Sequence, residues 1–352
     1  MLTPLTEQLA RREPLSPEQV RAAVALLASD QPSPQEKAAF LTRLAEKGET
    51  TSELTGFASE LRKLSIQPDL DPTLRSREIL DVCGTGGDRL NTFNISTTVA
   101  LLAASGGVVV AKHGNRAITS ASGSADVLEA LGIRIDLSPA EAAAALAEHH
   151  FAFLFAPNYH PAFRNIAPAR RLCAEAGQRT IFNLLGPLLN PVRPTVQLLG
   201  VPRPQLCEPF AHVLQSLGSR RAMVVCGSVG DAYLDELSTL GINTVAEFHH
   251  DRAFASSTFS PHDFPLSPAT LQDLTGGDRH VNAAIVTAIL SGKDRGPRRE
   301  AVLLNASAAL FLGGVTRSMS EGWDLAGKLI DSGKARSKLD DLVAASRGGG
   351  AR

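Results

Sequence analysis

The sequence predicts an α/β protein in which a small helical domain precedes a large domain with a central sheet flanked by helices. Helix-start motifs follow one another within residues 1–72, whereas helical patterns alternate with short aliphatic runs from Ile79 onward. The first of these runs ends in a glycine cluster, as strands often do before a turn. Alternation of this kind favours a sheet with helices on both faces.

The helical domain is predicted from its helix-start motifs. Ser16–Gln19 and Ser33–Glu36 each combine a serine N-cap, a proline at the first helical position and a glutamine or glutamate that completes a capping box. Thr50–Glu53 repeats the motif without the proline. Apolar residues follow at helical spacing: Val20, Val24 and Leu27, then Phe40, Leu41 and Leu44, then Leu54, Phe57, Leu61 and Leu64. We expect this domain to end near Pro68–Pro72.

The large domain is predicted from short apolar runs. Strands are expected at residues 77–83, 108–111, 133–137, 151–155, 196–201, 223–226 and 244–248. Ser138–Glu141 predicts the start of an intervening helix, and residues 251–267 carry no clear pattern.

The glycine cluster follows the first strand directly, in the run DVCGTGGD from Asp81 to Asp88. Three glycines in the four positions 84–87 permit positive φ and let backbone N–H groups approach a ligand. Ser96-Thr97-Thr98 then opens an apolar run that predicts a core helix, whose first N–H groups face the same place. The sequence therefore predicts an anion site.

Familiar nucleotide motifs do not fit this turn. Arg89 occupies the last glycine position of a dinucleotide fingerprint, and no Gly-Lys-Ser/Thr follows for a nucleotide P-loop. A glycine turn after a strand is also often only structural. Asp88 would be repelled by bare phosphates unless it binds a hydroxyl or a metal ion, so a sugar phosphate with bound magnesium fits best.

Two further segments extend the predicted site. The second strand ends at Lys112-His113-Gly114-Asn115-Arg116, and a loop rich in hydroxyl groups follows at residues 119–126. Asp235 and Glu236 come shortly after the strand at 221–227. Adjacent carboxylates on a loop are usually surface charge, but beside a phosphate site they are predicted magnesium ligands.

Taken together, these segments resemble the anthranilate phosphoribosyltransferase family. The matching blocks are GTGGD at 84–88, TFNIST at 92–97, KHGNR at 112–116, SGSADVLEALG at 122–132, FLFAPNYHPA at 153–162, RTIFNLLGPLLNP at 179–191, LDELST at 234–239 and GPRREAVLLNA at 296–306. The resemblance implies a nucleoside phosphorylase/phosphoribosyltransferase-like fold. It implies a helical domain of residues 1–72 that is completed by about 162–186, and an α/β donor-binding domain of residues 73–352.

The resemblance also implies a reaction. The phosphoribosyl group of 5-phosphoribosyl 1-pyrophosphate would pass to the amine of anthranilate, giving N-(5-phosphoribosyl)anthranilate and pyrophosphate in tryptophan biosynthesis. It implies Mg²⁺ as cofactor and a homodimer paired through the helical domains. Arg170 would lie across a cleft from the glycine loop, and a guanidinium suits the carboxylate of anthranilate. The segment after it, residues 171–178, is longer than is usual in the family.

By the same resemblance, the site residues fall into overlapping sets. The residues that would bind the phosphoribosyl donor are Gly84, Gly87, Asp88, Thr92, Asn94, Ile95, Ser96, Thr97, Lys112, Ser120 and Ser124. Magnesium binding falls to Ser96, Asp235 and Glu236, and anthranilate binding to Gly84, Asn115 and Arg170. Lys112, Asp235 and Glu236 would act catalytically, by stabilising the charge of the departing pyrophosphate with the metal ion.

Two alternative functions remain open at this point. A pyrimidine nucleoside phosphorylase would need a site that reads uracil or thymine, whereas Asn115 and its KHGNR block match the transferase better. A noncatalytic relative that binds nucleic acid would be expected to lose the acceptor residues and to carry a basic groove.

Composition restricts partners and location. The formal net charge of −1 over 352 residues gives no general attraction for nucleic acid. The four cysteines have no paired spacing, so neither a zinc site nor a disulfide framework is expected. Because no signal-like start and no long apolar span occur, we expect no membrane partner and a cytoplasmic location.

Overall fold

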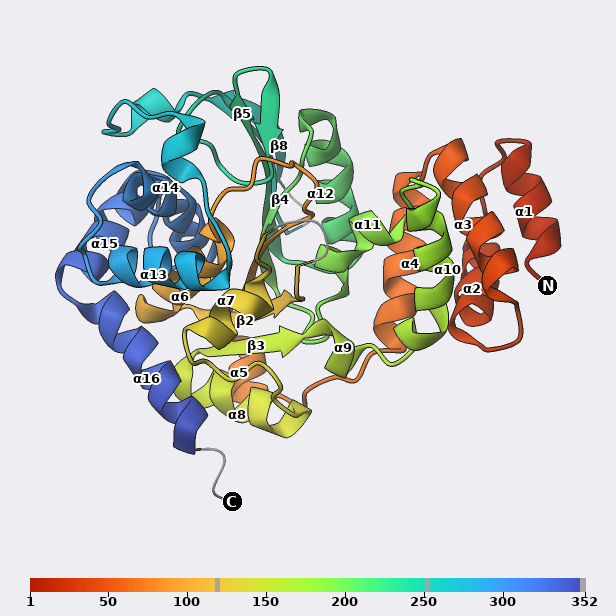
Figure 1. Cartoon of the computed structure of the whole chain (residues 1–352), viewed down its shortest axis with the longest axis horizontal. Coiled ribbons are helices and arrows are strands. Elements are labelled where there is room, and N and C mark those ends of the chain that lie inside the picture. The colour runs from red at the N-terminus through yellow and green to blue at the C-terminus, as the bar shows by residue number, and fades with distance from the viewer. Residues whose placement is uncertain (118–120, 251–252, 349–352) are drawn as a thin grey trace.

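The computed structural model describes residues 1–117, 121–250 and 253–348. A helical bundle stands beside a larger unit in which helices surround a central sheet (Figure 1). The fold class predicted from the sequence is therefore confirmed.

The N-terminal bundle begins with four helices: α1 (Thr3–Ala10), α2 (Pro17–Ala28), α3 (Pro34–Lys47) and α4 (Thr51–Lys63). The three predicted helix starts are confirmed, because Ser16, Ser33 and Thr50 each form a complete capping box. In each box the N-cap oxygen accepts from the backbone three residues on, and the side chain there accepts in return from the N-cap N–H. Local hydrogen bonds thus fix where these helices begin.

A helix from the middle of the chain joins this bundle. Figure 1 shows α10 (Phe163–Glu175) standing beside α2, α3 and α4, and α10 packs on α2 and α3. Asn165 of α10 donates through Nδ2 to the carbonyl of Ala28, at 2.7 Å, and its own carbonyl accepts from Nζ of Lys37, at 2.9 Å. These contacts support our proposal that residues 162–186 complete a discontinuous helical domain.

The sheet has the strand order β3-β2-β1-β4-β5-β7-β8, with β6 paired to β5. Five strands are parallel: β1 (Ile79–Gly84), β2 (Val109–Gly114), β3 (Phe151–Phe155), β4 (Val196–Gly200) and β5 (Arg221–Val229). Three join in antiparallel fashion: β6 (Ala232–Leu234), β7 (Asn243–His249) and β8 (Ala253–Phe259). The carboxyl ends of the parallel strands consequently lie at one edge, where ligands of α/β sheets usually bind.

Helices cover both faces of the sheet. Leu80 and Val82 of β1 join the apolar cluster formed with α6 (Ile95–Ser105), α13 (Arg279–Leu290), α14 (Pro297–Leu312), α15 (Met319–Asp331) and α16 (Lys334–Gly348). Ile79 and Cys83 point to the other face, where α8 (Pro139–His149) and α12 (Cys207–Ser216) pack. Short helices connect these elements: α5 (Pro72–Ser76), α7 (Ser124–Ala130), α9 (Ala156–Tyr159) and α11 (Phe182–Leu185). Across the described ranges, no helix has both the length and the apolar character to span a membrane.

One strand prediction is wrong, and two strands, β6 and β8, were not predicted. Residues 133–137 form no strand, although Ile133 and Ile135 are buried. The backbone there pairs with other groups, since the Arg134 N–H donates to Ser346 Oγ of α16, at 2.9 Å. Strand β8 escaped prediction because nearly all of its side chains are exposed, so no apolar alternation marks it.

Candidate active site

The chain positions Asp235 against the ends of two neighbouring parallel strands. Gly84 ends β1 and pairs in register with Gly200, which ends β4. A Cβ on Gly84 would overlap Oδ2 of Asp235, and a Cβ on Gly200 would overlap its backbone oxygen. Glycine at both positions therefore lets the segment that carries Asp235 and Glu236 lie directly on the strand ends.

The glycine loop has the conformation that its composition predicted. Gly86 and Gly87 have φ of 74° and 93°, a region that favours glycine. The N–H of Gly86 donates to Oδ2 of Asp235, at 2.7 Å. Arg179, from the segment between α10 and α11, also reaches this loop, because its Nη2 lies 3.3 Å from the Cβ position of Gly87. Arg179 is not among the predicted site residues, although it is the first residue of the matching block at 179–191.

Three carboxylates gather beside this loop. Burial, together with the charges of Asp88 and Glu236, raises the pKa of Asp235 well above its ordinary value. Burial also raises the pKa of Glu236 to about 7, although Lys112 opposes this rise. Carboxylates that repel one another in a buried place favour a bound cation, which would stabilise their ionised forms.

Lys112 connects these carboxylates to the start of α6. Its side chain is only 2% exposed, and burial lowers its pKa against the opposing effect of Asp81. Its Nζ donates to the carbonyl of Val82, at 2.6 Å, and to Oγ of Ser96, at 3.4 Å. The backbone N–H of Ser96 donates in turn to Oε1 of Glu236, at 3.0 Å. Lys112, Ser96 and Glu236 therefore meet at one point.

The donor groups present here fit magnesium. Among the described residues, no group of three or more His, Cys, Asp or Glu side chains could hold a metal ion. Asp235, Glu236 and the Ser96 hydroxyl would instead leave positions for water and for substrate oxygens. Magnesium usually binds in this way, through one or two carboxylates and phosphates.

The start of α6 presents unpaired polar groups. The helix begins at Ile95, one residue before the predicted start, and its N-cap residue Asn94 makes no side-chain capping bond. The buried hydroxyls of Thr97 and Ser122 have no hydrogen-bond partner within the part of the chain that the structure describes. Because an unpaired buried hydroxyl is costly, these groups mark a place where ligand oxygens could bind.

The structure also places other residues that are predicted to bind the donor. Ile95 is buried, and Thr92 forms an isolated bridge with Thr275. Oγ of Ser124, at the start of α7, donates to the carbonyl of Asn115, at 3.4 Å, so the second strand end and the hydroxyl-rich loop are joined. Ser120 lies outside the described residues.

Arg170 lies on α10, apart from the carboxylate group. Its guanidinium carbon is 5.3 Å from the ring centroid of Phe182, and burial lowers its pKa. The ion pairs among the described residues include none to Arg170, so its planar fork of donors is free for a carboxylate. Within the same residues, no hydrogen bond joins Arg170 or the exposed Asn115 to the carboxylate group.

A row of rings, all buried except the half-buried Phe163, links Arg170 to the second strand. Nε2 of His113 lies 3.1 Å from Nε2 of His160, and the ring centroids of His160 and Phe163 are 5.5 Å apart. The Phe163 and Phe182 centroids follow at 5.4 Å. Sequence reasoning missed His160, Phe163 and Phe182, because contact between distant segments leaves no local pattern.

Two hollows on the helical bundle offer no comparable chemistry. One, of about 510 Å³, is lined by residues of α2, α4 and α12, and the other, of about 330 Å³, by residues of α1, α3 and the turn at Arg12. Neither contains a residue of the strand-end group. The strand ends are therefore the better candidate for the active site.

Two family models match this chain. Residues 3–65 match the helical bundle domain of the glycosyl transferase family, and residues 76–336 match its a/b domain. An anthranilate phosphoribosyltransferase from Chloroflexus aggregans is 46% identical over 316 residues, which cover 90% of each chain.

Solved structures are similar over nearly the whole length. Anthranilate phosphoribosyltransferase from Thermus thermophilus is 39% identical and matches with a TM-score of 0.87, covering 97% of this chain and 99% of that one. Anthranilate phosphoribosyltransferase from Saccharomyces cerevisiae, in complex with PRPP and Mg, is 28% identical with a TM-score of 0.86, covering 99% and 98%.

Proposed function

This chain belongs to the anthranilate phosphoribosyltransferase family, and we infer from that membership which reaction its site performs. It transfers the phosphoribosyl group of 5-phosphoribosyl 1-pyrophosphate to the amine of anthranilate, in tryptophan biosynthesis. The observation that carries this function is the meeting of the glycine loop, Lys112 and the pair Asp235 and Glu236 at one sheet edge. Backbone donors, a buried cation and metal-binding carboxylates are what a pyrophosphate leaving group requires.

The donor is proposed to bind around the glycine loop and the start of α6. The unpaired hydroxyl of Thr97 and the helix N-terminus support phosphate binding there. The residues proposed for the donor are Gly84, Gly87, Asp88, Thr92, Asn94, Ile95, Ser96, Thr97, Lys112, Ser120 and Ser124.

Magnesium is proposed to bind to Ser96, Asp235 and Glu236. The raised pKa values of both carboxyls support this assignment, because a divalent cation would offset the burial and the carboxylate repulsion that raise them. Magnesium supplies charge neutralisation to the pyrophosphate when bound. Lys112 adds a fixed positive charge beside it, in a buried place where electrostatic interactions are strong.

Anthranilate is proposed to bind to Arg170, Asn115 and Gly84. Arg170 pairs with the carboxylate and thereby orients the amine toward the donor. A bond then forms between the amine nitrogen and the anomeric carbon of the ribose, and the bond from that carbon to the pyrophosphate oxygen breaks with its electron pair. The nitrogen loses a proton after attack, so no dedicated general base is needed to activate it. Water exclusion protects the donor from hydrolysis.

The decisive experiment follows the fluorescence of anthranilate with the purified protein. Addition of 5-phosphoribosyl 1-pyrophosphate and Mg²⁺ should quench the signal, while omission of either should leave it unchanged. No specific observation favours a pyrimidine nucleoside phosphorylase, and phosphorolysis of uridine or thymidine tests it directly. A salt-dependent DNA titration tests the nucleic-acid-binding alternative. Pairing into homodimers is a further proposal, which sedimentation velocity checks.

A further inference from the structure

Two asparagine side chains form a continuous hydrogen-bonded chain at the edge of the donor site. The N–H of Gly277 donates to Oδ1 of Asn282, at 2.8 Å. Nδ2 of Asn282 donates to Oδ1 of Asn94, at 2.9 Å, and Nδ2 of Asn94 donates to the carbonyl of Ser122, at 3.2 Å. The chain thus joins the segment before α13, the N-cap of α6 and the hydroxyl-rich loop.

The backbone groups at its two ends fix the direction of this chain. A backbone N–H can only donate and a backbone carbonyl can only accept. Gly277 therefore requires an oxygen from Asn282, which must then turn its NH₂ group toward Asn94. Asn94 in turn presents its oxygen to Asn282 and its NH₂ group to Ser122. Neither amide can be reversed without placing like groups in contact at both of its bonds.

Close packing holds Asn282 in this position. Its side chain is 2% exposed, and a Cβ on Gly276 would lie 2.7 Å from its Oδ1 and 2.8 Å from Cα of Phe93. The N–H of Phe93 also donates to the carbonyl of Leu274, at 3.0 Å. The segment that leads into the donor site therefore rests directly on the turn before α13.

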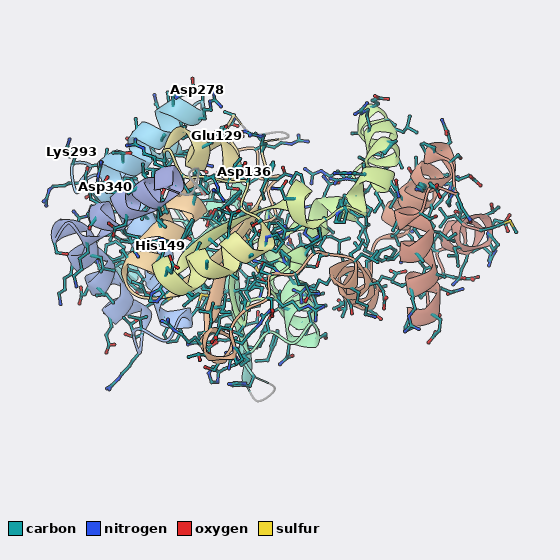
Figure 2. The ribbon with its side chains drawn as sticks, turned by 90° about the horizontal axis from the view of Figure 1, so that it is seen from below. Glu129, Asp136, His149, Asp278, Lys293 and Asp340 are labelled. Carbon is teal, nitrogen blue, oxygen red and sulfur yellow. The ribbon has the colours of Figure 1, made fainter. Side chains whose placement is uncertain are left out.

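The start of α13 is itself anchored. Asp278 caps the helix by accepting from the N–H groups of His280 and Val281. Figure 2 shows Asp278 near Glu129 of α7, and Arg279 pairs with Glu129 at 3.3 Å. Asn282, one turn into α13, is therefore held by a rigid element and acts on a side chain of the site.

We propose that Asn282 is a positioning residue for the phosphoribosyl donor. It orients the amide of Asn94 so that the NH₂ group faces Ser122. One N–H of that group donates to the Ser122 carbonyl, and the second points to an oxygen of the bound phosphoribosyl donor. The same bond keeps the loop after β2 close to the start of α6. This inference rests on the proposed function, in which Asn94 contacts the donor.

Two substitutions separate bond polarity from packing. Asn282→Leu keeps the approximate shape but removes the donor to Asn94, and we expect the KM for 5-phosphoribosyl 1-pyrophosphate to rise about tenfold. Asn282→Asp places an oxygen, in place of the NH₂ group, against Oδ1 of Asn94, and it changes no other contact with a side chain of the site. It should therefore raise this KM further than leucine does. The KM for anthranilate at saturating phosphoribosyl donor should change less than about twofold, because neither Asn282 nor Asn94 is among the residues proposed to bind anthranilate.

Val286→Ala is the matched control, because Val286 is fully buried one turn further along α13 and lies outside the amide chain. It lowers stability through a cavity and should leave the donor KM unchanged. Calorimetry with donor and Mg²⁺ in the absence of anthranilate should give the same order of affinities as the kinetics.

The inference would be overturned if wild type and Asn282→Leu had equal KM values for 5-phosphoribosyl 1-pyrophosphate. It would also be overturned if Asn282→Leu and Val286→Ala changed this KM equally. If the aspartate variant does not fold, the leucine variant alone decides the outcome. Donor binding by calorimetry also keeps this test apart from the proposed reaction, since wild type that binds the donor without consuming anthranilate would refute only the reaction.

Discussion

Gly84 and Asp235 are in such close contact that a single methyl group on Gly84 would overlap the Asp235 carboxylate. The end of β1 thus forms the surface on which a proposed magnesium ligand rests. Gly84 therefore affects the proposed metal site although it has no side chain itself.

The first prediction follows from that contact. Gly84→Ala should push the Asp235 side chain away and raise the Mg²⁺ concentration needed for half-maximal activity, because the carboxylate cannot keep its position beside the new methyl group. Gly327→Ala is the control, since its Cβ would meet only one atom of Arg299, at 3.8 Å, and helical alanine is favourable. An unchanged magnesium titration for Gly84→Ala would show that Asp235 does not bind the ion.

The second prediction concerns charge in the same group. Replacing Asp235 by Asn and Glu236 by Gln should lower turnover strongly and weaken its magnesium dependence. Without magnesium, the double variant should melt at the same temperature as wild type or higher, because it removes two buried charges whose burial and repulsion raise both pKa values. Thermal melts at about pH 8, with and without Mg²⁺, measure this at a pH where the carboxyls can ionise. If magnesium raises the melting temperature of wild type no more than that of the variant, the assignment is contradicted.

Local patterns explain which features the sequence could predict. The capping boxes at Ser16, Ser33 and Thr50 were predictable because every partner lies within one helical turn. The glycine loop was recognisable because it follows a strand and precedes a helix start within a short run. The pair at Asp235 was recognisable only because a phosphate site had already been predicted.

Features made by distant contacts were not predictable in this way. Arg179 meets Gly87, and Asn282 meets Asn94, only after the chain has folded. The strand predicted at residues 133–137 was wrong for the same reason, because a short apolar run indicates burial but not which groups the backbone pairs with. A lone Arg or Asn in a helix or linker carries no signal of the site that it will reach.

The third prediction concerns the buried ring pair of His113 and His160. Burial lowers the pKa of His113 to about 3 and that of His160 to about 4, against an ordinary value of 6.5. Because the unfolded chain takes up these protons first, the stabilisation is complete above about pH 6.5 and is lost as the pH falls toward the folded values. For His160 alone the loss amounts to about 3 kcal/mol.

His160→Gln tests this dependence, since an amide can still donate to Nε2 of His113 but does not titrate between about pH 4 and pH 7. Denaturant unfolding across that range should show a weaker loss of stability in acid for the variant than for wild type. Asp81 acts in the opposite direction, because burial raises its pKa to about 6, but it is present in both proteins and cancels in the comparison. Parallel curves for the two proteins would contradict the neutral ring pair.

The last prediction concerns Arg170, whose guanidinium stacks near Phe182 and is proposed to pair with the carboxylate of anthranilate. Loss of a buried partner should cost roughly 2–5 kcal/mol, because the carboxylate is left desolvated without its counterion. Arg170→Ala should therefore lower kcat/KM for anthranilate by a factor of about thirty or more, with donor binding preserved. Arg170→Lys should retain more kcat/KM than Arg170→Ala but less than wild type, since an ammonium group cannot reproduce the planar fork of the guanidinium.

Arg171→Ala supplies the matched control, because Arg171 is the next residue on α10 and its side chain is exposed. It should leave the kinetics of anthranilate near those of wild type, as expected for an exposed side chain away from the site. The opposite result, with Arg170→Ala unaffected, would mean that the longer segment at 171–178 shifts the acceptor site along α10. Arg164 or Arg171 would then be the better candidate for the carboxylate, and the same two-variant comparison at those positions would identify which one binds it.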